Sequence, residues 1–260
     1  MIQIAIAFDK PKLIYVHIVW RHGDRAPVIN YPNNIHKVKY WPNGYGELTE
    51  RGLSQQYALG RKLRGYYFNN SNDNQSEPFI SRHHLYKQVY IRSTDKNRTL
   101  LSAMATVAGM FSTDDVSDRK FDKNDKDSDY SQMAWPHGWI PVPVHTIMTE
   151  SRFVDNPFYQ CERAAKLEAD AYKSDDYQNM KREHKEFLED IANKSGSPTT
   201  IENGFIREYD CYFCEHDITI NALMIALNCE LNVLGKLSEI GYGANVAFEL
   251  YLINNLPYVK

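Results

Sequence analysis

Two stretches of the sequence share the same succession of local patterns. Each begins with an apolar run, and a helical pattern follows it. The first run is LIYVHIVW (13–20), and the helical pattern after it begins at Thr49. The second is KQVYIRS (87–93), which leads directly into a helical segment at 94–111. Continuous β-rich runs of this kind are typical of buried strands in parallel sheets. Because strands alternate with helices, the sequence predicts an α/β fold with a mainly parallel central sheet flanked by helices.

Both expected helices have residues suited to their first turn. Thr49 can cap the first helix, and Thr94 or Asp95 can cap the second, because their side-chain oxygens accept hydrogen bonds from free backbone N–H groups. In the first helix, apolar side chains recur at helical spacing and predict a buried face. They are Leu53, Tyr57, Leu59, Leu63 and Tyr66 or Tyr67.

The rest of the chain changes character several times. Residues 112–131 are strongly charged and predict a solvated loop. The prolines of 139–146 exclude a helix interior there, so this segment is expected to be extended. Residues 160–193 have a charged helical pattern that fits a peripheral subdomain, and 207–214 and 244–253 predict two more strands. The sparse apolar anchors of the charged helical region are Leu167, Phe187, Leu188 and Ile191.

The heptapeptide RHGDRAP (21–27) follows the first expected strand directly. It places Arg21, His22 and Arg25 around Gly23. The planar guanidinium of arginine donates two parallel hydrogen bonds and suits phosphate, and glycine lets the backbone pass close to a ligand. A histidine among such arginines could attack phosphorus and form a phosphohistidine that water later hydrolyses. The structural alternative is a surface loop with scattered charge.

Two other expected strand ends also carry charged residues. Arg92 ends the second strand, and His216 and Asp217 follow the strand predicted at 207–214. Since strand ends in an α/β fold share one crevice, we expect these side chains to converge on His22. A carboxyl group there could protonate the leaving group, and Asp217 is the candidate. A helix N-cap at Asp217 and a packed imidazole at His216 are the structural alternatives.

Together these motifs resemble those of the histidine acid phosphatases, which are marked by RHGxRxP near the N-terminus and HD near the C-terminus. The resemblance extends to LTERGLSQQYALGRKLRGYY, VYIRSTDKNRTLLSAMATVAGMF, IPVPVHT and ANVAFELY, and so covers most of the chain. It implies that His22 is the nucleophile and Asp217 the proton donor. It also implies phosphate contacts from Arg21, Arg25, Arg92 and His216, with no metal and no organic cofactor.

The resemblance also implies a domain organisation and an activity. Residues 1–115 and 203–260 are expected to form the α/β phosphatase core, and 116–202 a helical cap that is shorter than in the family, as is the C-terminus. The implied function is an acid phosphatase that hydrolyses phosphate monoesters through a phosphohistidine. A phytase-like or lysophosphatidate phosphatase would use the same site, and a catalytically impaired secreted binding protein of this fold is the alternative from another class. A homodimer is left open.

Composition bears on partners and compartment. The net charge is −3 and the lysines and arginines form no long block, so a nucleic-acid partner is not indicated. No stretch approaches the roughly 18 apolar residues that a membrane-spanning helix needs. The resemblance predicts a secreted or lysosomal glycoprotein. The matching glycosylation sequons are at Asn69, Asn74, Asn97 and Asn193.

The cysteines and the remaining histidines give weaker signals. The four cysteines are Cys161, Cys211, Cys214 and Cys229. Cys211 and Cys214 have the gap of a zinc knuckle or a thiol pair, but no second pair lies at zinc-finger spacing, so core or disulfide cysteines are expected. His36 and the histidines at 83–84 lie in polar loops without spaced carboxylates, and no metal site is expected there. His145 is expected to be structural.

Overall fold

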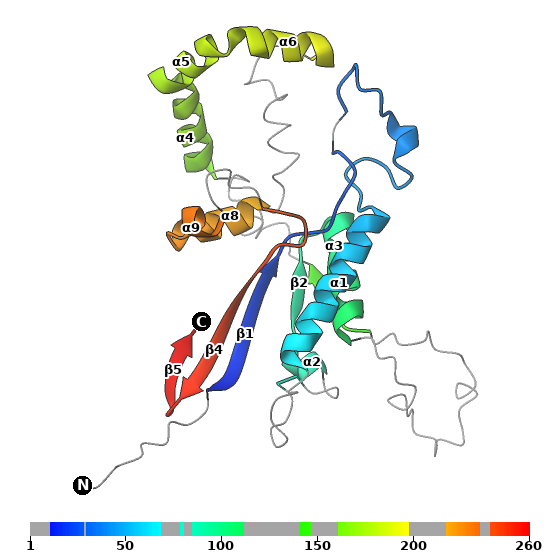
Figure 1. The fold of residues 1–260 in the computed structure, drawn as a ribbon, viewed down its shortest axis with the longest axis vertical. Helices are drawn as coiled ribbons and strands as arrows, with labels where there is room; N and C mark the ends of the chain where they lie inside the picture. The colour runs from blue at the N-terminus through cyan, green and yellow to red at the C-terminus, as the bar shows by residue number, and fades with distance from the viewer. Residues whose placement is uncertain are drawn as a thin grey trace.

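The computed structural model describes residues 11–28, 30–68, 79–80, 85–111, 141–146, 161–197, 217–234 and 240–260. They form two small sheets, a pair of packed helices and an arch of exposed helices (Figure 1). The strands are β1 (Lys12–Trp20), β2 (Ile91–Ser93), β3 (Val144–Thr146), β4 (Asn245–Ile253) and β5 (Leu256–Val259). The helices are the 3-10 turn η1 (Val38–Tyr40), α1 (Glu50–Tyr67), α2 (Leu85–Gln88), α3 (Asn97–Phe111), α4 (Glu162–Lys173), α5 (Asp175–Glu183), α6 (Lys185–Ser195), α8 (Asp217–Ala226) and α9 (Glu230–Leu234).

The larger sheet is antiparallel and has the strand order β1-β4-β5. β1 and β4 pair along most of their length, from Lys12 opposite Leu252 to Trp20 opposite Asn245. β4 and β5 are joined by a two-residue turn, in which Asn254 and its neighbour have positive φ angles of 52° and 61°. Asparagine tolerates this conformation, and such a turn matches the twist of a hairpin. The sheet therefore places β4, which lies far from β1 in sequence, directly beside it.

Parallel pairing is confined, among the described strands, to the short pair β2 and β3. The strand predicted at 13–20 is confirmed, but its described neighbour β4 runs in the opposite direction. An apolar run specifies a strand without specifying the direction of its partner, and antiparallel strands can leave one face to solvent. Ile14 and Tyr15 of β1 are 40% and 55% exposed. The described part of the chain thus has mixed α/β content rather than an extended parallel sheet.

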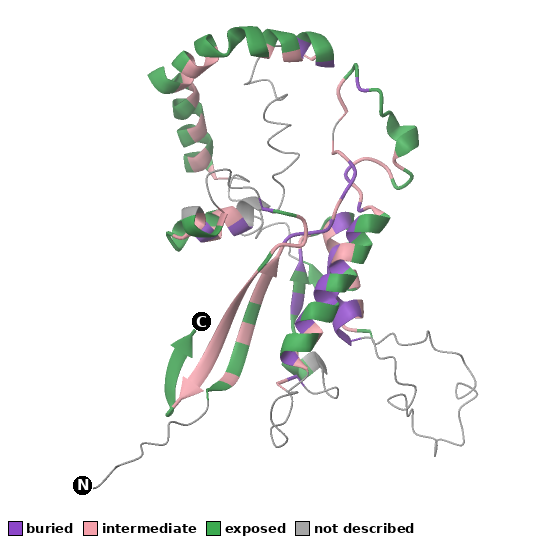
Figure 2. Ribbon diagram, in the orientation of Figure 1, coloured by how far each residue is buried: buried purple, intermediate pink, exposed green. Residues whose placement is uncertain are grey.

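Helices α1 and α3 pack closely against each other. At their crossing, a Cβ atom added to Gly60 would lie 2.0 Å from the carbonyl oxygen of Thr106, and one added to Gly109 would lie 2.2 Å from that of Tyr57. Only glycine allows two helix backbones to approach so closely. The main apolar core lies here, and Figure 2 shows the buried residues gathered in α1, α3 and β2. Its buried members are Leu59, Leu63, Tyr67, Ile80, Ile91, Ala103, Val107, Met110 and Phe111.

The start of α1 is confirmed, and its predicted apolar face is partly corrected. The hydroxyl of Thr49 accepts a hydrogen bond of 3.0 Å from the N–H of Gly52, as a helix N-cap does. The helix turns Leu53, Tyr57 and Tyr66 outward, where they are 38%, 42% and 64% exposed. Only the part of the predicted face that meets α3 is buried. The second helix begins at Asn97, three residues later than its predicted start at residue 94.

The helical pattern predicted for residues 160–193 is confirmed by α4, α5 and α6, which form the arch at the top of Figure 1. Ser174 caps α5 by accepting a hydrogen bond from the N–H of Tyr177, and Gly196 ends α6 at a φ of 72°. No residue of α4 or α5, both of which are described throughout, is buried. The expected anchors Leu167 and Phe187 are 57% and 62% exposed, because little of the described chain lies against them.

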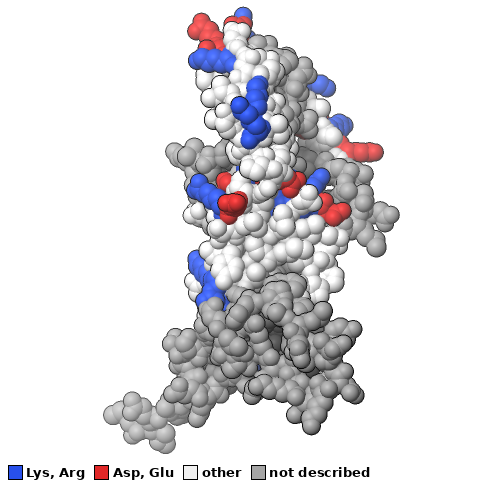
Figure 3. All heavy atoms as spheres, turned by 90° about the vertical axis from the view of Figure 1, so that its right-hand side faces the viewer, with Lys and Arg blue, Asp and Glu red and all other residues white. Residues whose placement is uncertain are grey.

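Charged side chains of both signs are interspersed on the described surface seen in Figure 3. In α6, Lys185 with Glu189 and Lys194 with Asp190 form ion pairs four residues apart, at 3.8 and 2.7 Å. Exposed pairs of this kind contribute little to stability. Within the described part of the chain, none of the helices combines the length and the hydropathy needed to cross a bilayer.

Candidate active site

The RHGDRAP segment forms a buried loop at the end of β1. Arg21 and His22 are each 2% exposed, and Arg25 is 5% exposed. The backbone N–H of Arg21 donates to the carbonyl of Ala244 at 2.9 Å, which ties the loop to the chain just before β4. The side-chain amide of Gln56, which is fully buried in α1, donates to the carbonyl of Arg21 at 3.0 Å. The loop is therefore fixed from both sides and is not a surface loop with scattered charge.

Gly23 allows this loop to pack closely against α1. A Cβ atom added to Gly23 would lie 2.4 Å from the carbonyl oxygen of Gly52, and one added to Gly52 would lie 2.1 Å from that of Asp24. Asp24 also accepts a hydrogen bond of 2.6 Å from the hydroxyl of Thr49. From the other side, the N–H of Gly23 donates to the hydroxyl of Ser102 in α3 at 3.2 Å. The sequence suggested a glycine that approaches a ligand, whereas the close approach seen here is to the first turn of α1.

The imidazole of His22 has a defined orientation. Its Nδ1 atom lies 2.7 Å from the carbonyl oxygen of Gly23. Because a carbonyl oxygen can only accept, Nδ1 must carry the proton of this hydrogen bond. In a neutral imidazole the other nitrogen, Nε2, then keeps its lone pair. Nε2 is therefore the ring nitrogen of His22 that has a lone pair in this tautomer.

Arg25 of the RHGDRAP loop has a second buried guanidinium group near it, that of Arg98, which the sequence analysis missed. Arg25 donates to the carbonyl of Ala26 at 3.1 Å. Arg98 of α3 is 7% exposed, and its Nη1 atom lies 3.5 Å from the carbonyl oxygen of Gly46. Burial and then the nearby charge of Arg25 lower the pKa of Arg98 to about 10, against the opposing effect of Glu47. Arg98 is therefore still a cation at neutral pH, and the two groups concentrate positive charge.

A sequence signal for Arg98 does exist. Arg98, Ser102 and Thr106 recur every fourth residue of α3, and all three are buried on the face that meets the loop and α1. A stripe of polar residues within an otherwise apolar and small-residue helix indicates that the helix faces a polar site. No such signal marks Gln56, whose role depends on the loop that packs over it.

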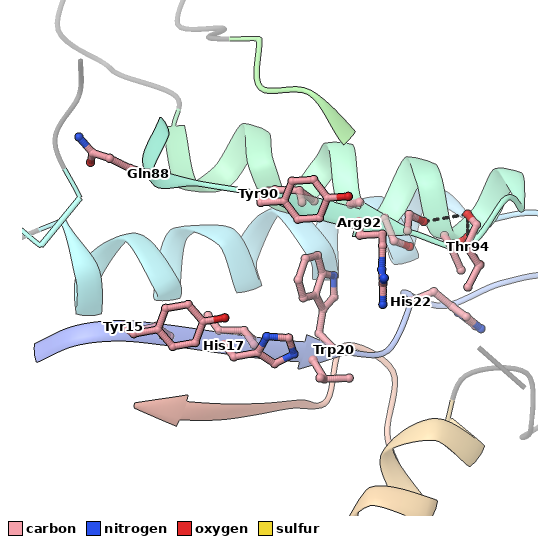
Figure 4. Close-up of a pocket in the computed structure, with 16 residues that line it drawn as sticks. Tyr15, His17, Trp20, His22, Gln88, Tyr90, Arg92 and Thr94 are labelled. Carbon is pink, nitrogen blue, oxygen red and sulfur yellow. Dashed lines mark hydrogen bonds between the residues drawn. The ribbon is translucent and has the colours of Figure 1, made fainter. Parts of the chain in front are cut away.

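Arg92 and His22 line one groove. The groove has a volume of about 580 Å³ and runs between β1 and β2. Figure 4 shows both strands running in the same direction, with Arg92 extending from β2 toward the loop that carries His22. Unlike Arg21 and Arg25, Arg92 is exposed, so its guanidinium is accessible to a ligand. The structure thus brings together four of the six predicted site residues, Arg21, His22, Arg25 and Arg92.

The remaining two predicted residues are less fully described. His216 lies outside the described residues, and of Asp217 the structure describes only the backbone, as the first residue of α8. Ile220, one turn later, belongs to a small apolar cluster that includes Val19 of β1. This packing brings the start of α8 to the end of β1. Convergence of the Asp217 side chain on His22 stays a prediction.

His145, Cys161 and Cys229 make contacts of other kinds. His145 stacks on Tyr90, with ring centroids 4.8 Å apart, as a packed aromatic residue would. Cys161 caps α4, where its sulfur accepts a hydrogen bond from the N–H of Ala164, and it and Cys229 are free thiols. The residues at 83–84, Cys211 and Cys214 lie outside the described part of the chain. Among the described residues, no group of three His, Cys, Asp or Glu side chains could hold a metal ion.

Similarity to known proteins agrees with this geometry. A model of the histidine phosphatase superfamily (branch 2) matches residues 12–215. The lysosomal acid phosphatase of Xenopus laevis is 35% identical over 233 residues, which are 89% of this chain and 48% of that protein. The prostatic acid phosphatase of Homo sapiens is 32% identical over 235 residues, 88% of this chain and 54% of that protein. The chain thus spans about half the length of the curated relatives it matches.

Among solved structures, a Hafnia alvei phytase in complex with tartrate gives a TM-score of 0.49 at 13% identity, and the likeness covers 96% of this chain and 84% of that chain. This score is too low to carry an inference. The family match, by contrast, extends over most of the chain and includes the RHGDRAP loop, α1, α3 and the arch. The chain therefore belongs to the histidine phosphatase superfamily, branch 2.

Proposed function

We propose that this chain is an acid phosphatase that hydrolyses phosphate monoesters through a phosphohistidine at His22. The observation that carries the proposal is the fixed imidazole, whose Nδ1 donates to the carbonyl of Gly23 at 2.7 Å and leaves Nε2 for attack. Arg21 and Arg25 lie in the same buried loop, and Arg92 lines the same groove. These cations would neutralise the phosphate oxygens and stabilise the charge that develops in the transition state.

The reaction has two steps. In the first, Nε2 of His22 bonds to phosphorus while the bond from phosphorus to the ester oxygen breaks, and Asp217 gives its proton to the departing oxygen. In the second, Asp217 takes a proton from water, the water oxygen bonds to phosphorus, and the bond to Nε2 breaks to release phosphate. The first step needs a protonated carboxyl group. Since an ordinary aspartate has a pKa near 4, this requirement favours acid pH.

Substitution of His22 tests the proposal. His22→Ala should abolish hydrolysis of p-nitrophenyl phosphate at acid pH, whereas His36→Ala, which changes an exposed histidine on another loop, should leave it unchanged. Asp217→Asn should slow poor leaving groups more than p-nitrophenolate, which needs little protonation to depart. Hydrolysis that persists in a purified His22→Ala protein would contradict the mechanism. A folded wild-type chain without any hydrolysis would favour the impaired binding protein instead.

We also propose that β1 and β2 belong to one mainly parallel sheet. The support is that these strands run side by side in the same direction with the groove between their facing edges (Figure 4). The strand predicted at 207–214 lies outside the described residues. Hydrogen exchange tests this. Amides of Val16 and Ile18 on the groove edge should be protected, and rapid exchange at both would contradict the proposal.

The domain boundaries and the compartment are further proposals. Residues 1–115 and 203–260 would form the phosphatase core and 116–202 the cap, which is supported by the exposed arch of α4, α5 and α6. The relatives are named lysosomal and prostatic acid phosphatases, which supports a secreted or lysosomal protein. Glycosidase sensitivity of the protein expressed through a secretory route would test the compartment. A protein that never acquires glycans there would contradict it.

A further inference from the structure

The segment at 240–244 forms hydrogen bonds with the first two residues of the RHGDRAP loop, although it is far from them in sequence. The N–H of Arg21 donates to the carbonyl of Ala244 at 2.9 Å, and the N–H of Gly243 donates to the carbonyl of His22 at 3.2 Å. The guanidinium of Arg21 also donates to the carbonyl of Ile240, 219 positions away along the chain. Three backbone groups of this segment therefore hold the residues that bind phosphate and attack it.

Tyr242 lies in the middle of this segment and contacts both residues with its ring. The Cζ atom of Arg21 lies 4.4 Å from the centre of the Tyr242 ring, a distance at which an aromatic face attracts a guanidinium. The ring centroids of Tyr242 and His22 are 5.7 Å apart at an interplanar angle of 38°. Arg21 and His22 are each 2% exposed, so the contacts lie where water screens them little.

The way in which Arg21 is held has a chemical consequence. A carboxylate that fixed this guanidinium would cancel its charge and compete with phosphate for its N–H groups. The carbonyl oxygen of Ile240 and the aromatic face of Tyr242 are both uncharged. These two contacts orient the group without themselves neutralising its positive charge.

We propose that Tyr242 is a positioning residue of the phosphatase site, whose ring fixes Arg21 for phosphate binding and limits the rotation of the His22 imidazole. The inference rests on the proposed function. It makes the segment before β4 part of the catalytic machinery, although its own residues carry no reactive group.

The experiment compares three substitutions in the full 260-residue chain. Tyr242→Phe keeps the ring, whereas Tyr242→Leu and Tyr242→Met remove it. The readouts are kcat and KM for p-nitrophenyl phosphate, and the inhibition constant of inorganic phosphate. Tyr258→Leu serves as the control, because Tyr258 is a 55% exposed tyrosine on β5.

Loss of the ring should raise both the phosphate inhibition constant and KM by about tenfold. This factor corresponds to the free energy of a partly desolvated cation–π contact. Tyr242→Phe and Tyr258→Leu should stay near wild type. A purely structural role would lower the amount of active enzyme, and so kcat, without moving the inhibition constant. That result would overturn the proposal, as would equal losses in Tyr242→Phe and Tyr242→Leu or a failure of both ring-less variants to fold.

Failure of the Tyr242 proposal can be distinguished from failure of the proposed function. If the wild-type chain does not hydrolyse the ester, the proposed function fails, and phosphate binding measured by calorimetry replaces the inhibition constant. A tenfold weaker affinity in Tyr242→Leu would then still support the role of the ring in holding Arg21. Equal phosphate affinity, or no phosphate binding by either protein, would overturn it.

Discussion

The helix pair α1–α3 and the helical arch α4–α6 differ in how the rest of the protein holds them. At the crossing of α1 and α3, backbones meet so closely that a Cβ atom on Gly60 would lie 2.0 Å from a carbonyl oxygen. In the arch, α4 and α5 have no buried residue. The end of α6 is linked to the loop after β1, because the backbone N–H of Asn33 donates to the carbonyl of Ser195 at 2.9 Å. The RHGDRAP loop packs against the first region, which we therefore expect to tolerate substitution least.

The largest effect is expected where the loop meets α1. In Gly52→Ala the new methyl group would lie 2.1 Å from the carbonyl oxygen of Asp24, so either the helix start or the loop must move. We expect the free energy of unfolding to fall by about 3 kcal/mol, at the upper end for overpacking. Hydrolysis should be lost as well, because Asp24 lies two positions after His22. Urea denaturation followed by circular dichroism measures the first effect.

Gly65→Ala on the same helix is the matched control. An added Cβ atom at Gly65 has no atom within 4 Å, so this change should stabilise the helix by up to about 1 kcal/mol through its higher helix propensity. If Gly52→Ala and Gly65→Ala gave equal stabilities, close backbone contact would not be what holds the loop.

These contacts also show what the sequence could predict. The cap at Thr49 is a local pattern, and it was predicted correctly. The direction of β4 relative to β1 was not predictable, because an apolar run looks alike in parallel and antiparallel sheets. The structural use of Gly23 was missed for a related reason. A glycine in a loop does not reveal which backbone approaches it.

Residues that act through tertiary contacts were the hardest to find. Gln56 and Tyr242 have ordinary sequence surroundings, and only the folded chain places one under the carbonyl of Arg21 and the other over its guanidinium. Arg98 could have been recognised from its spacing with Ser102. Local patterns thus singled out the candidate site residues, whereas most of the residues that hold them became visible only in the structure.

A smaller effect is expected where α1 joins the sheet. The hydroxyl of Tyr67 donates to a carboxylate oxygen of Glu249 in β4 at 2.9 Å. Burial first, and then this hydrogen bond, raise the pKa of Tyr67 above its ordinary value of 10. The folded protein therefore keeps the proton where the unfolded chain loses it, so stability is full below pH 10 and falls as the pH rises above that value.

Tyr67→Phe isolates this contribution. The variant should lose about 1 kcal/mol at neutral pH, the net value of one hydrogen bond. It should then lose less stability than wild type between neutral pH and about pH 11, because its unfolded state has one proton fewer to release. Tyr66→Phe, at a tyrosine that is 64% exposed, is the control. An alkaline loss that is identical in wild type and Tyr67→Phe would contradict the assignment.

The smallest effect is expected in the arch. Phe187 of α6 is 62% exposed, so Phe187→Ser removes little buried surface and should change the free energy of unfolding by less than about 0.5 kcal/mol, with kcat/KM unchanged. Phe111→Ser is the control in α3, where the same residue type is 2% exposed and its loss should cost at least about 3 kcal/mol. Thermal melts of both variants measure the contrast. A loss above about 1 kcal/mol at Phe187 would mean that its face is covered in solution, and the arch would then be held by apolar packing as the α1–α3 pair is.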